Sequence, residues 1–180
     1  LREWRALLEL PVAQLPEPLW PVPDPMGGLA ALVLSRAAGV PLSQALRGAD
    51  AALVAGALAE ALRALAAVHA AGWVHGDLHG GNVLLDLDAA DGPAVALLDL
   101  GLADRAGALP AGPGLVQFAA PDRLRGAPAD PRDDLFALAG SVWLAWCAVP
   151  AWPGYPARMP LSGEMPQMPP GLDGHPDIVA

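Results

Sequence analysis

Apolar residues recur at steps of three and four positions between Asp50, a residue type suited to cap a helix, and Gly72, which suits a helix end. This spacing predicts a long helix whose apolar stripe packs in the core. His69 falls on the last turn, where a packed histidine is more common than a ligand. The stripe is formed by four residues, Val54, Leu58, Leu62 and Leu65. A similar spacing over residues 1–10 predicts the end of another helix before Pro11.

Three short apolar runs have the length of strands rather than helices. Residues 29–34 predict one buried strand. The segment 35–39, which contains Ser, Arg and Gly, ends it. Residues 82–86 and 94–98 predict two more strands, joined across an Asp-Gly-Pro turn at 91–93. A hairpin of this kind brings Asn82 and Asp99 to the same end.

The longest uncharged run covers residues 135–152 and approaches the length of a membrane span. Gly140 interrupts the run and Pro150 stops it, so we expect a buried core helix instead. No signal peptide opens the chain, and we expect a soluble protein without a membrane partner. From Pro150 onwards, frequent prolines exclude long helices and predict a poorly ordered C-terminal segment over residues 150–180.

Charge and cysteine content narrow the function classes. The 180 residues carry a net charge of −9, and all ten basic residues are arginines that form no run. A nucleic-acid partner is therefore not expected. The single cysteine, Cys147, lies in an apolar run and cannot form an intrachain disulfide, which favours a reducing, cytoplasmic location.

Candidate chemistry centres on three oxygen-bearing side chains. Asn82 offers an amide oxygen and Asp99 a carboxylate, the ligand types that Mg²⁺ prefers. Asp77, five residues before Asn82, is suited to accept or orient the proton of an attacking hydroxyl. Phosphoryl transfer needs positioning and neutralisation of phosphate charge more than covalent chemistry, so this set of residues predicts a phosphotransferase.

These residues lie in motifs that resemble those of protein kinases. The pattern His75-x-Asp77-Leu78-x-x-x-Asn82 resembles the kinase catalytic loop, and residues 99–101, Asp-Leu-Gly, resemble the Asp-Phe-Gly motif. Downstream, residues 120–122, Ala-Pro-Asp, resemble Ala-Pro-Glu, and residues 134–138 resemble the start of the central helix of the large lobe. Residues 117–126 and 130–138 together look like the eukaryotic-like bacterial Ser/Thr kinases.

The resemblance implies an α+β, protein kinase-like fold, mainly the helical C-lobe with a partial N-lobe. We expect residues 1–34 to form the partial small lobe and residues 35–149 the large lobe. Asp134 is expected to bind the backbone around His75 and Gly76. ATP and Mg²⁺ are the implied cofactors, with Asp77 and His79 catalytic and with Asn82 and Asp99 on the metal. The implied nucleotide-binding residues are Leu34, Ser35, Arg36, Ala37, Asn82, Leu84 and Asp99.

The chain also departs from the kinase pattern. It contains no lysine, and His79 stands where the catalytic loop of kinases has one. Because an imidazole is mostly uncharged at neutral pH, His79 is expected to steady a γ-phosphate poorly. The glycine-rich loop and the nucleotide-binding lysine are expected upstream of Leu1, since the chain does not begin with Met. Glu3 falls where the regulatory helix of kinases holds the glutamate that pairs with that lysine.

Regulation is expected to differ as well. Residues 101–133, the equivalent of the activation segment, contain no Ser, Thr or Tyr. Gly76 replaces the arginine that holds an activation-segment phosphate in many kinases. The sequence therefore predicts activity that is not switched by phosphorylation of this segment. Asp122 is expected to lack the basic partner that its kinase counterpart has.

The sequence predicts an ATP-dependent protein Ser/Thr kinase-like phosphotransferase, with ATP and a protein substrate as partners. Two alternatives stay open. The His-Gly-Asp-Leu-His-x-Gly-Asn pattern also resembles the loop of aminoglycoside-type, small-molecule phosphotransferases. The missing lysines fit a catalytically impaired pseudokinase that binds partners without transferring phosphate.

Overall fold

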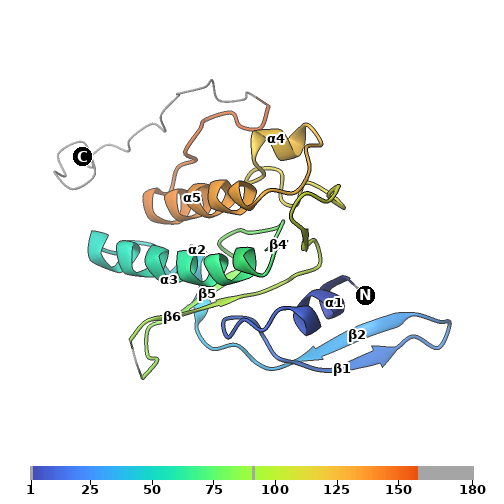
Figure 1. The fold of residues 1–180 in the computed structure, drawn as a ribbon. Helices are drawn as coiled ribbons and strands as arrows, with labels where there is room; N and C mark the ends of the chain where they lie inside the picture. The colour runs from blue at the N-terminus through green and yellow to red at the C-terminus, as the bar shows by residue number, and fades with distance from the viewer. Residues whose placement is uncertain (1, 91, 158–180) are drawn as a thin grey trace.

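The computed structural model describes residues 2–90 and 92–157, which form a mixed α+β fold of a few helices and small sheets (Figure 1). Helix α3 (Ala51–Ala70) lies between helix α5 (Pro131–Cys147) and the hairpin of β5 (Val83–Asp86) and β6 (Ala94–Leu97). Helix α1 (Arg2–Glu9) lies beyond the hairpin. This architecture is compatible with a kinase-like phosphotransferase fold.

Helix α3 begins as predicted, with the side chain of Asp50 accepting a hydrogen bond from the Leu53 N–H at 2.8 Å. Its buried face is richer in alanine than expected: Val54, Ala57, Ala61, Ala64, Leu65 and Val68. The prediction that Leu62 packs in the core is wrong, because Leu62 is 40% exposed. It follows the buried Ala61 by one residue, about 100° around the helix, and so lies off the buried face.

Helix α5 provides the other long core element. It begins with a capping box formed by Asp130 and Asp133, and it ends where Ala148 takes a left-handed conformation with φ of 57°. The helix therefore ends at Cys147, before the C-terminal end of the uncharged run over residues 135–152. Its buried positions include Leu138 and Val142. Of the helices in the described ranges, α3 has the length and apolar composition to cross a membrane, but core helices of globular domains meet the same criteria.

The hairpin predicted from the sequence is present. Strands β5 and β6 are antiparallel with Val83 opposite Leu97, and the short strand β3 (Val40–Pro41) pairs with the other edge of β5. Helix α2 (Leu42–Ala45) follows β3 directly. A second small sheet pairs β4 (Trp73–Val74) with β7 (Asp104–Arg105), and α4 (Pro121–Leu124) precedes α5.

The N-terminal elements form a helix and a separate hairpin. Strand β1 (Pro18–Pro23) pairs antiparallel with β2 (Leu29–Leu34), which confirms the strand predicted over residues 29–34. The prediction that this strand is buried is wrong: its residues are exposed or half-buried, because it belongs to a separate two-stranded sheet. Helix α1 contributes Ala6 and Leu7 to the core that α3 and the β5–β6 hairpin share. Ion pairs also attach this helix to β7: Arg2 to Asp104 at 2.6 Å and Glu9 to Arg105 at 2.5 Å.

Most of the segment expected to be poorly ordered lies outside the described residues. In its described part, residues 150–157, Ala151 is buried and the Trp152 ring stacks on Phe136 with centroids 5.0 Å apart. The division of the chain into a small lobe, a large lobe and a C-terminal segment stays a prediction.

Candidate active site

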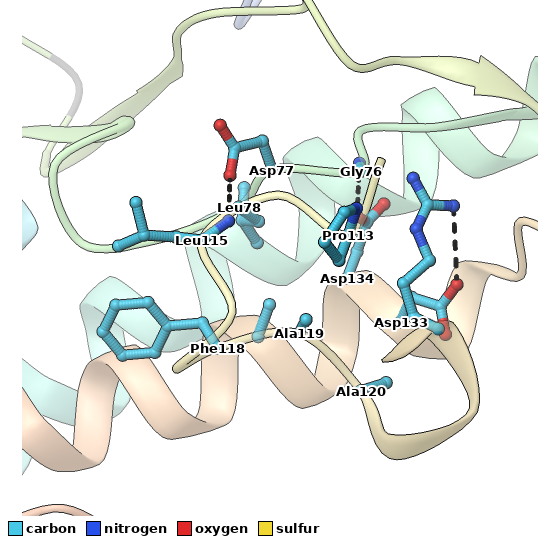
Figure 2. Close-up of a pocket in the computed structure, with 12 residues that line it drawn as sticks. Gly76, Asp77, Leu78, Pro113, Leu115, Phe118, Ala119, Ala120, Asp133 and Asp134 are labelled. Atoms are coloured by element: carbon cyan, nitrogen blue, oxygen red, sulfur yellow. Dashed lines mark hydrogen bonds and ion pairs between the residues drawn. The ribbon is translucent and has the colours of Figure 1, made fainter. Parts of the chain in front are cut away.

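The buried carboxylate of Asp134 organises the loop that follows β4. It is 1% exposed and accepts hydrogen bonds from the N–H of His75 at 2.8 Å and of Gly76 at 2.9 Å. These bonds confirm the contacts expected for Asp134, and Figure 2 shows the bond to Gly76. His69, at the end of α3, adds a contact of 2.8 Å between its Nε2 and the same carboxylate. The start of α5 therefore fixes the loop that carries Asp77.

The side chain of His75 connects this loop to the end of β6. The ring is fully buried, and its Nε2 lies 2.9 Å from the carbonyl oxygen of Leu98. Because a carbonyl oxygen only accepts, Nε2 carries the proton. Nδ1 is then free to accept from the Asp77 N–H at 3.4 Å. His75 thus joins the backbone of the proposed base to the residue immediately before Asp99.

Asn82 and Asp99 flank the open end of the β5–β6 hairpin. The Leu98 N–H donates to the Asn82 carbonyl oxygen at 2.8 Å, which extends the strand pairing by one position. The Asn82 Nδ2 donates to the carbonyl oxygen of Asp77 at 3.0 Å, so its amide oxygen is not used in that bond. Asn82 therefore links the loop of the proposed base to the hairpin.

Asp99 has an uncommon backbone conformation, with φ of 60°. Aspartate tolerates this left-handed region better than most residues, and such conformations cluster at functional sites. Its Oδ1 accepts from the Gly101 N–H at 3.0 Å, which leaves Oδ2 unbonded among the described residues. The exposed carboxylate and the Asn82 amide oxygen are a donor set that suits Mg²⁺, which usually keeps several waters and phosphate oxygens. The described ranges hold no cluster of three or more His, Cys, Asp or Glu residues able to bind a metal alone.

Glu3, on helix α1, faces the same region. Burial raises the pKa of its carboxyl group, and the neighbouring charge of Asp99 raises it further, while a hydrogen bond from the Leu100 backbone opposes the shift. The glutamate therefore lies next to the Asp-Leu-Gly segment. Its predicted lysine partner is not in this chain, which contains none.

The other predicted nucleotide-binding residues lie on β2, after it, or on β5. Leu34 and Glu3 line a cavity of about 400 Å³ that also reaches Gly101. Ser35 is engaged locally, because its N–H donates to the Glu17 carbonyl and its hydroxyl accepts from the Glu17 N–H, both at 2.8 Å. Three further predicted residues do not line this cavity: the exposed Arg36 and the half-buried Ala37 and Leu84. Their roles stay predictions.

The carboxylate of Asp77 is held by the chain segment that precedes α4. The Leu115 N–H donates to Asp77 Oδ1 at 2.8 Å, and Figure 2 shows Leu115 beside that carboxylate. Gly114 makes the close approach possible, because its φ is 70° and a Cβ there would lie 2.6 Å from Asp77 Oδ1. Oδ2 has no partner among the described residues and is free to meet an acceptor hydroxyl.

Arg123, in α4, attaches the same segment from the other side. It is 4% exposed, its Nε donates to the Gly112 carbonyl oxygen at 3.1 Å, and its Nη1 lies 4.0 Å from Asp133 Oδ2. Its Nη2 would lie 3.1 Å from a Cβ at Gly76, so the arginine occupies space that a larger residue there would need. A cavity of about 10 Å³ between these groups is roughly the size that holds one water.

Asp122 forms an ion pair of a different kind from the one known in kinases, because its carboxylate pairs with the neighbouring Arg125 at 2.9 Å. The pair is local, at a spacing of three residues within one helical turn, and both side chains are exposed. Such a pair contributes little stability. The expected lack of the kinase-type partner stays a prediction.

His79 lies on the side of the loop that faces α2 and α5. Its Nδ1 accepts from the Gly81 N–H at 3.0 Å, so in this conformation the ring proton lies on Nε2. The ring stacks on Phe118 with centroids 6.3 Å apart. Its predicted role beside the γ-phosphate stays a prediction.

Sequence reasoning missed two residues around Asp77. Leu115 acts through its backbone, which no side-chain pattern reveals, although the Gly-Pro-Gly run at 112–114 indicates a tight turn nearby. Arg123 is a single arginine without a motif. The acid content of the chain, nearly twice its arginine content, gave no reason to single it out.

A comparison with known families supports the phosphotransferase interpretation. The model of a family described as "Phosphotransferase enzyme family" matches residues 69–108, which span the last turn of α3, the loop with Asp77, the β5–β6 hairpin and Asp99. That family includes aminoglycoside kinases and protein kinase-like members. A search of curated proteins found no match. The matched region therefore supports a kinase-type phosphotransferase domain without distinguishing its acceptor.

Proposed function

We propose that this protein transfers the γ-phosphate of Mg²⁺-ATP to the hydroxyl of a serine or threonine in a protein. In this proposal Asp77 accepts or orients the hydroxyl proton, while Asn82 and Asp99 hold the metal. Leu34, residues 35–37 and Leu84 contact the nucleotide. The cysteine content favours a cytoplasmic location for the reaction.

The observation that carries the proposal is the set of hydrogen bonds joining the proposed residues. Asn82 binds the Asp77 carbonyl, and the His75 ring contacts both Asp77 and Leu98, the neighbour of Asp99. Catalysis of phosphoryl transfer depends mainly on positioning and charge stabilisation, and fixed backbone contacts of this kind supply the positioning. Mg²⁺ would supply neutralisation of the phosphate charge.

The free oxygen of Asp77 defines where the acceptor must approach. Because Oδ1 is bonded to the Leu115 N–H, Oδ2 is the atom that would take the proton of the acceptor hydroxyl. The segment from Gly114 to Phe118 then borders the acceptor. One side of the proposed base is therefore bordered by this protein's own chain and not by solvent alone.

A second candidate is a small-molecule phosphotransferase of the aminoglycoside type. The matched family includes such enzymes, and the match covers the residues that both kinds of enzyme would use. The two candidates share the roles of Asp77, Asn82 and Asp99 and differ in the acceptor.

A γ-phosphate transfer assay tests the proposal, with a generic protein acceptor and an aminoglycoside in parallel reactions. We expect Mg²⁺-dependent labelling of the protein acceptor, reduced about 100-fold or more by Asp77→Asn. Asp88→Asn, an exposed turn residue, is the matched control. Labelling of the aminoglycoside alone would favour the second candidate. Nucleotide binding without transfer to either acceptor would contradict both and favour a binding domain.

A further inference from the structure

A groove of about 680 Å³ lies beside the proposed base. Its walls come from α2 and the turn after it, the loop from His79 to Gly81, the C-terminal half of α5 with Ala148, and three residues before α4: Leu115, Gln117 and Phe118. Leu115 lines the groove, and its N–H donates to the Asp77 carboxylate. The groove thus shares Leu115 and Phe118 with the surroundings of Asp77, whereas the cavity of about 10 Å³ that Asp77 itself lines is too small for an acceptor.

Arg47 supplies a fixed positive charge to this groove. Its Nε donates to the Ser43 carbonyl oxygen at 3.1 Å, which holds the guanidinium against α2. The Ser43 N–H in turn donates to the Gly80 carbonyl oxygen at 3.0 Å, so α2 is attached to the loop that carries the proposed base. Within residues 2–90 and 92–157, no acceptor bonds the two Nη atoms of Arg47 and no carboxylate pairs with it.

Two other polar groups that line the groove, on His79 and Ser141, are able to donate hydrogen bonds. His79 has its proton on Nε2, as its Nδ1 accepts from Gly81. The Ser141 hydroxyl, in a residue 3% exposed, has no hydrogen-bond partner among the described residues. None of the described residues that line the groove is Asp or Glu. In a chain with 19 acidic and 10 basic residues, an acid-free groove that contains a free arginine is a distinct local environment.

We propose that this groove binds an acidic segment of the protein acceptor, with a carboxylate on Arg47 while the acceptor hydroxyl lies at Asp77. The inference rests on the proposed function and specifies its substrate class. A guanidinium with two free Nη atoms can bind a carboxylate through two parallel hydrogen bonds. The Phe118 ring, stacked on His79, provides an apolar surface for the part of the peptide between the two contacts.

The overall charge of −9 does not decide the acceptor. Charges more than about 8–10 Å apart are largely screened at physiological salt, so the groups inside the groove dominate the interaction with a bound side chain. A polycationic acceptor such as an aminoglycoside would meet Arg47 without any lining carboxylate to pair with its amines. In this proposal the charge of the groove favours an acidic protein segment over a polycationic aminoglycoside.

Binding of three serine peptides tests the proposal independently of catalysis. The peptides share one length and one central serine and carry glutamate, alanine or lysine at the flanking positions. Fluorescence anisotropy of labelled peptides measures each dissociation constant with the whole chain at two salt concentrations. We expect the glutamate peptide to bind at least about tenfold more tightly than the lysine peptide, with the difference shrinking at high salt.

Arg47→Gln is the decisive variant, and Arg63→Gln removes the same charge from the exposed surface of α3 as its control. Arg47→Gln should weaken binding of the glutamate peptide about tenfold, and Arg63→Gln should leave it unchanged. Equal binding of all three peptides, preference for the lysine peptide, or no effect of Arg47→Gln would overturn the proposal. Mg²⁺-nucleotide binding, measured in the same samples, reports separately on the proposed function.

Discussion

The two sides of the proposed active site differ in how firmly the chain holds them. On the side of the proposed base, His75 is fully buried and its ring bonds Asp77 and Leu98, while Asp134, 1% exposed, accepts from the N–H groups of His75 and Gly76. On the side of α1 and β1–β2, apolar side chains face solvent, with Trp20 58% and Met26 94% exposed. The proposed base and metal residues are therefore held by buried hydrogen bonds, while the N-terminal hairpin has few buried contacts of its own.

This difference indicates which residues of the proposed reaction are held in position before any substrate binds. Preorganised groups contribute most when they lie where charge develops, and the described hydrogen bonds fix the proposed base, Asp77, and the proposed metal ligand, Asn82. On the opposite side, attachment depends on the core face of α1 and on two ion pairs with β7. We infer that changes in α1 affect nucleotide binding more than they affect the geometry of the loop with Asp77.

Removing the Asp134 carboxylate should have the largest effect on stability. In Asp134→Ala the buried N–H groups of His75 and Gly76 lose their acceptor, which should lower the free energy of unfolding by roughly 3 kcal/mol. Chemical denaturation followed by tryptophan fluorescence measures this change. Asp122→Ala, on the exposed surface, should change it by less than about 0.5 kcal/mol. Equal effects of the two variants would show that the loop is not held as described.

The contact between Gly114 and Asp77 can be broken without touching the base itself. In Gly114→Ala a methyl group would lie 2.6 Å from Asp77 Oδ1, on a backbone with φ of 70°. We expect a loss of about 1–2 kcal/mol and faster hydrogen exchange at the Leu115 amide.

Gly112→Ala is the matched control for that variant. Nothing lies within 4 Å of a Cβ at Gly112, and its φ is not positive. The control should keep both the stability and the protection of the Leu115 amide. Unchanged exchange at Leu115 in Gly114→Ala would contradict the bond between Leu115 and Asp77.

The smallest effect is expected at Glu3, on the less firmly held side. Burial and the Asp99 charge raise the pKa of Glu3 above its usual value, so ionisation of this carboxyl destabilises the folded chain. The penalty is absent below the unfolded pKa near 4.5 and grows as pH rises through the folded value. Glu3→Gln should therefore stabilise the protein at pH 7 and have no such effect at pH 4.

Glu17→Gln removes the same charge from an exposed position and serves as the control for this measurement. Thermal unfolding at the two pH values gives the comparison. A stabilisation by Glu3→Gln that is equal at pH 4 and pH 7 would show that charge at Glu3 is not its cause.

Much of the fold near the site could be predicted because it depends on local patterns. The turn at 91–93 with apolar runs on both sides predicted the β5–β6 hairpin, and Asp50 predicted the start of α3. The contacts of Asp134 were expected from the resemblance to kinases and are present.

The remaining features depend on contacts between distant segments, which a single sequence does not encode locally. Leu62 fits a helical stripe by spacing, but the side that is buried depends on where α5 and β6 pack. Leu115 binds Asp77 through its backbone, 38 residues away in the chain. Arg47 lines the groove only because α2 is attached to Gly80.

Mg²⁺-dependent nucleotide binding tests the central claim most directly, because it needs no acceptor. Titration of a fluorescent ATP analogue, with and without Mg²⁺, should show binding that Mg²⁺ strengthens. That dependence should be lost in Asp99→Asn and Asn82→Ala and kept in Asp77→Asn. Binding that ignores Mg²⁺, or equal losses in all three variants, would contradict the assignment of Asn82 and Asp99 to the metal and of Asp77 to the proton.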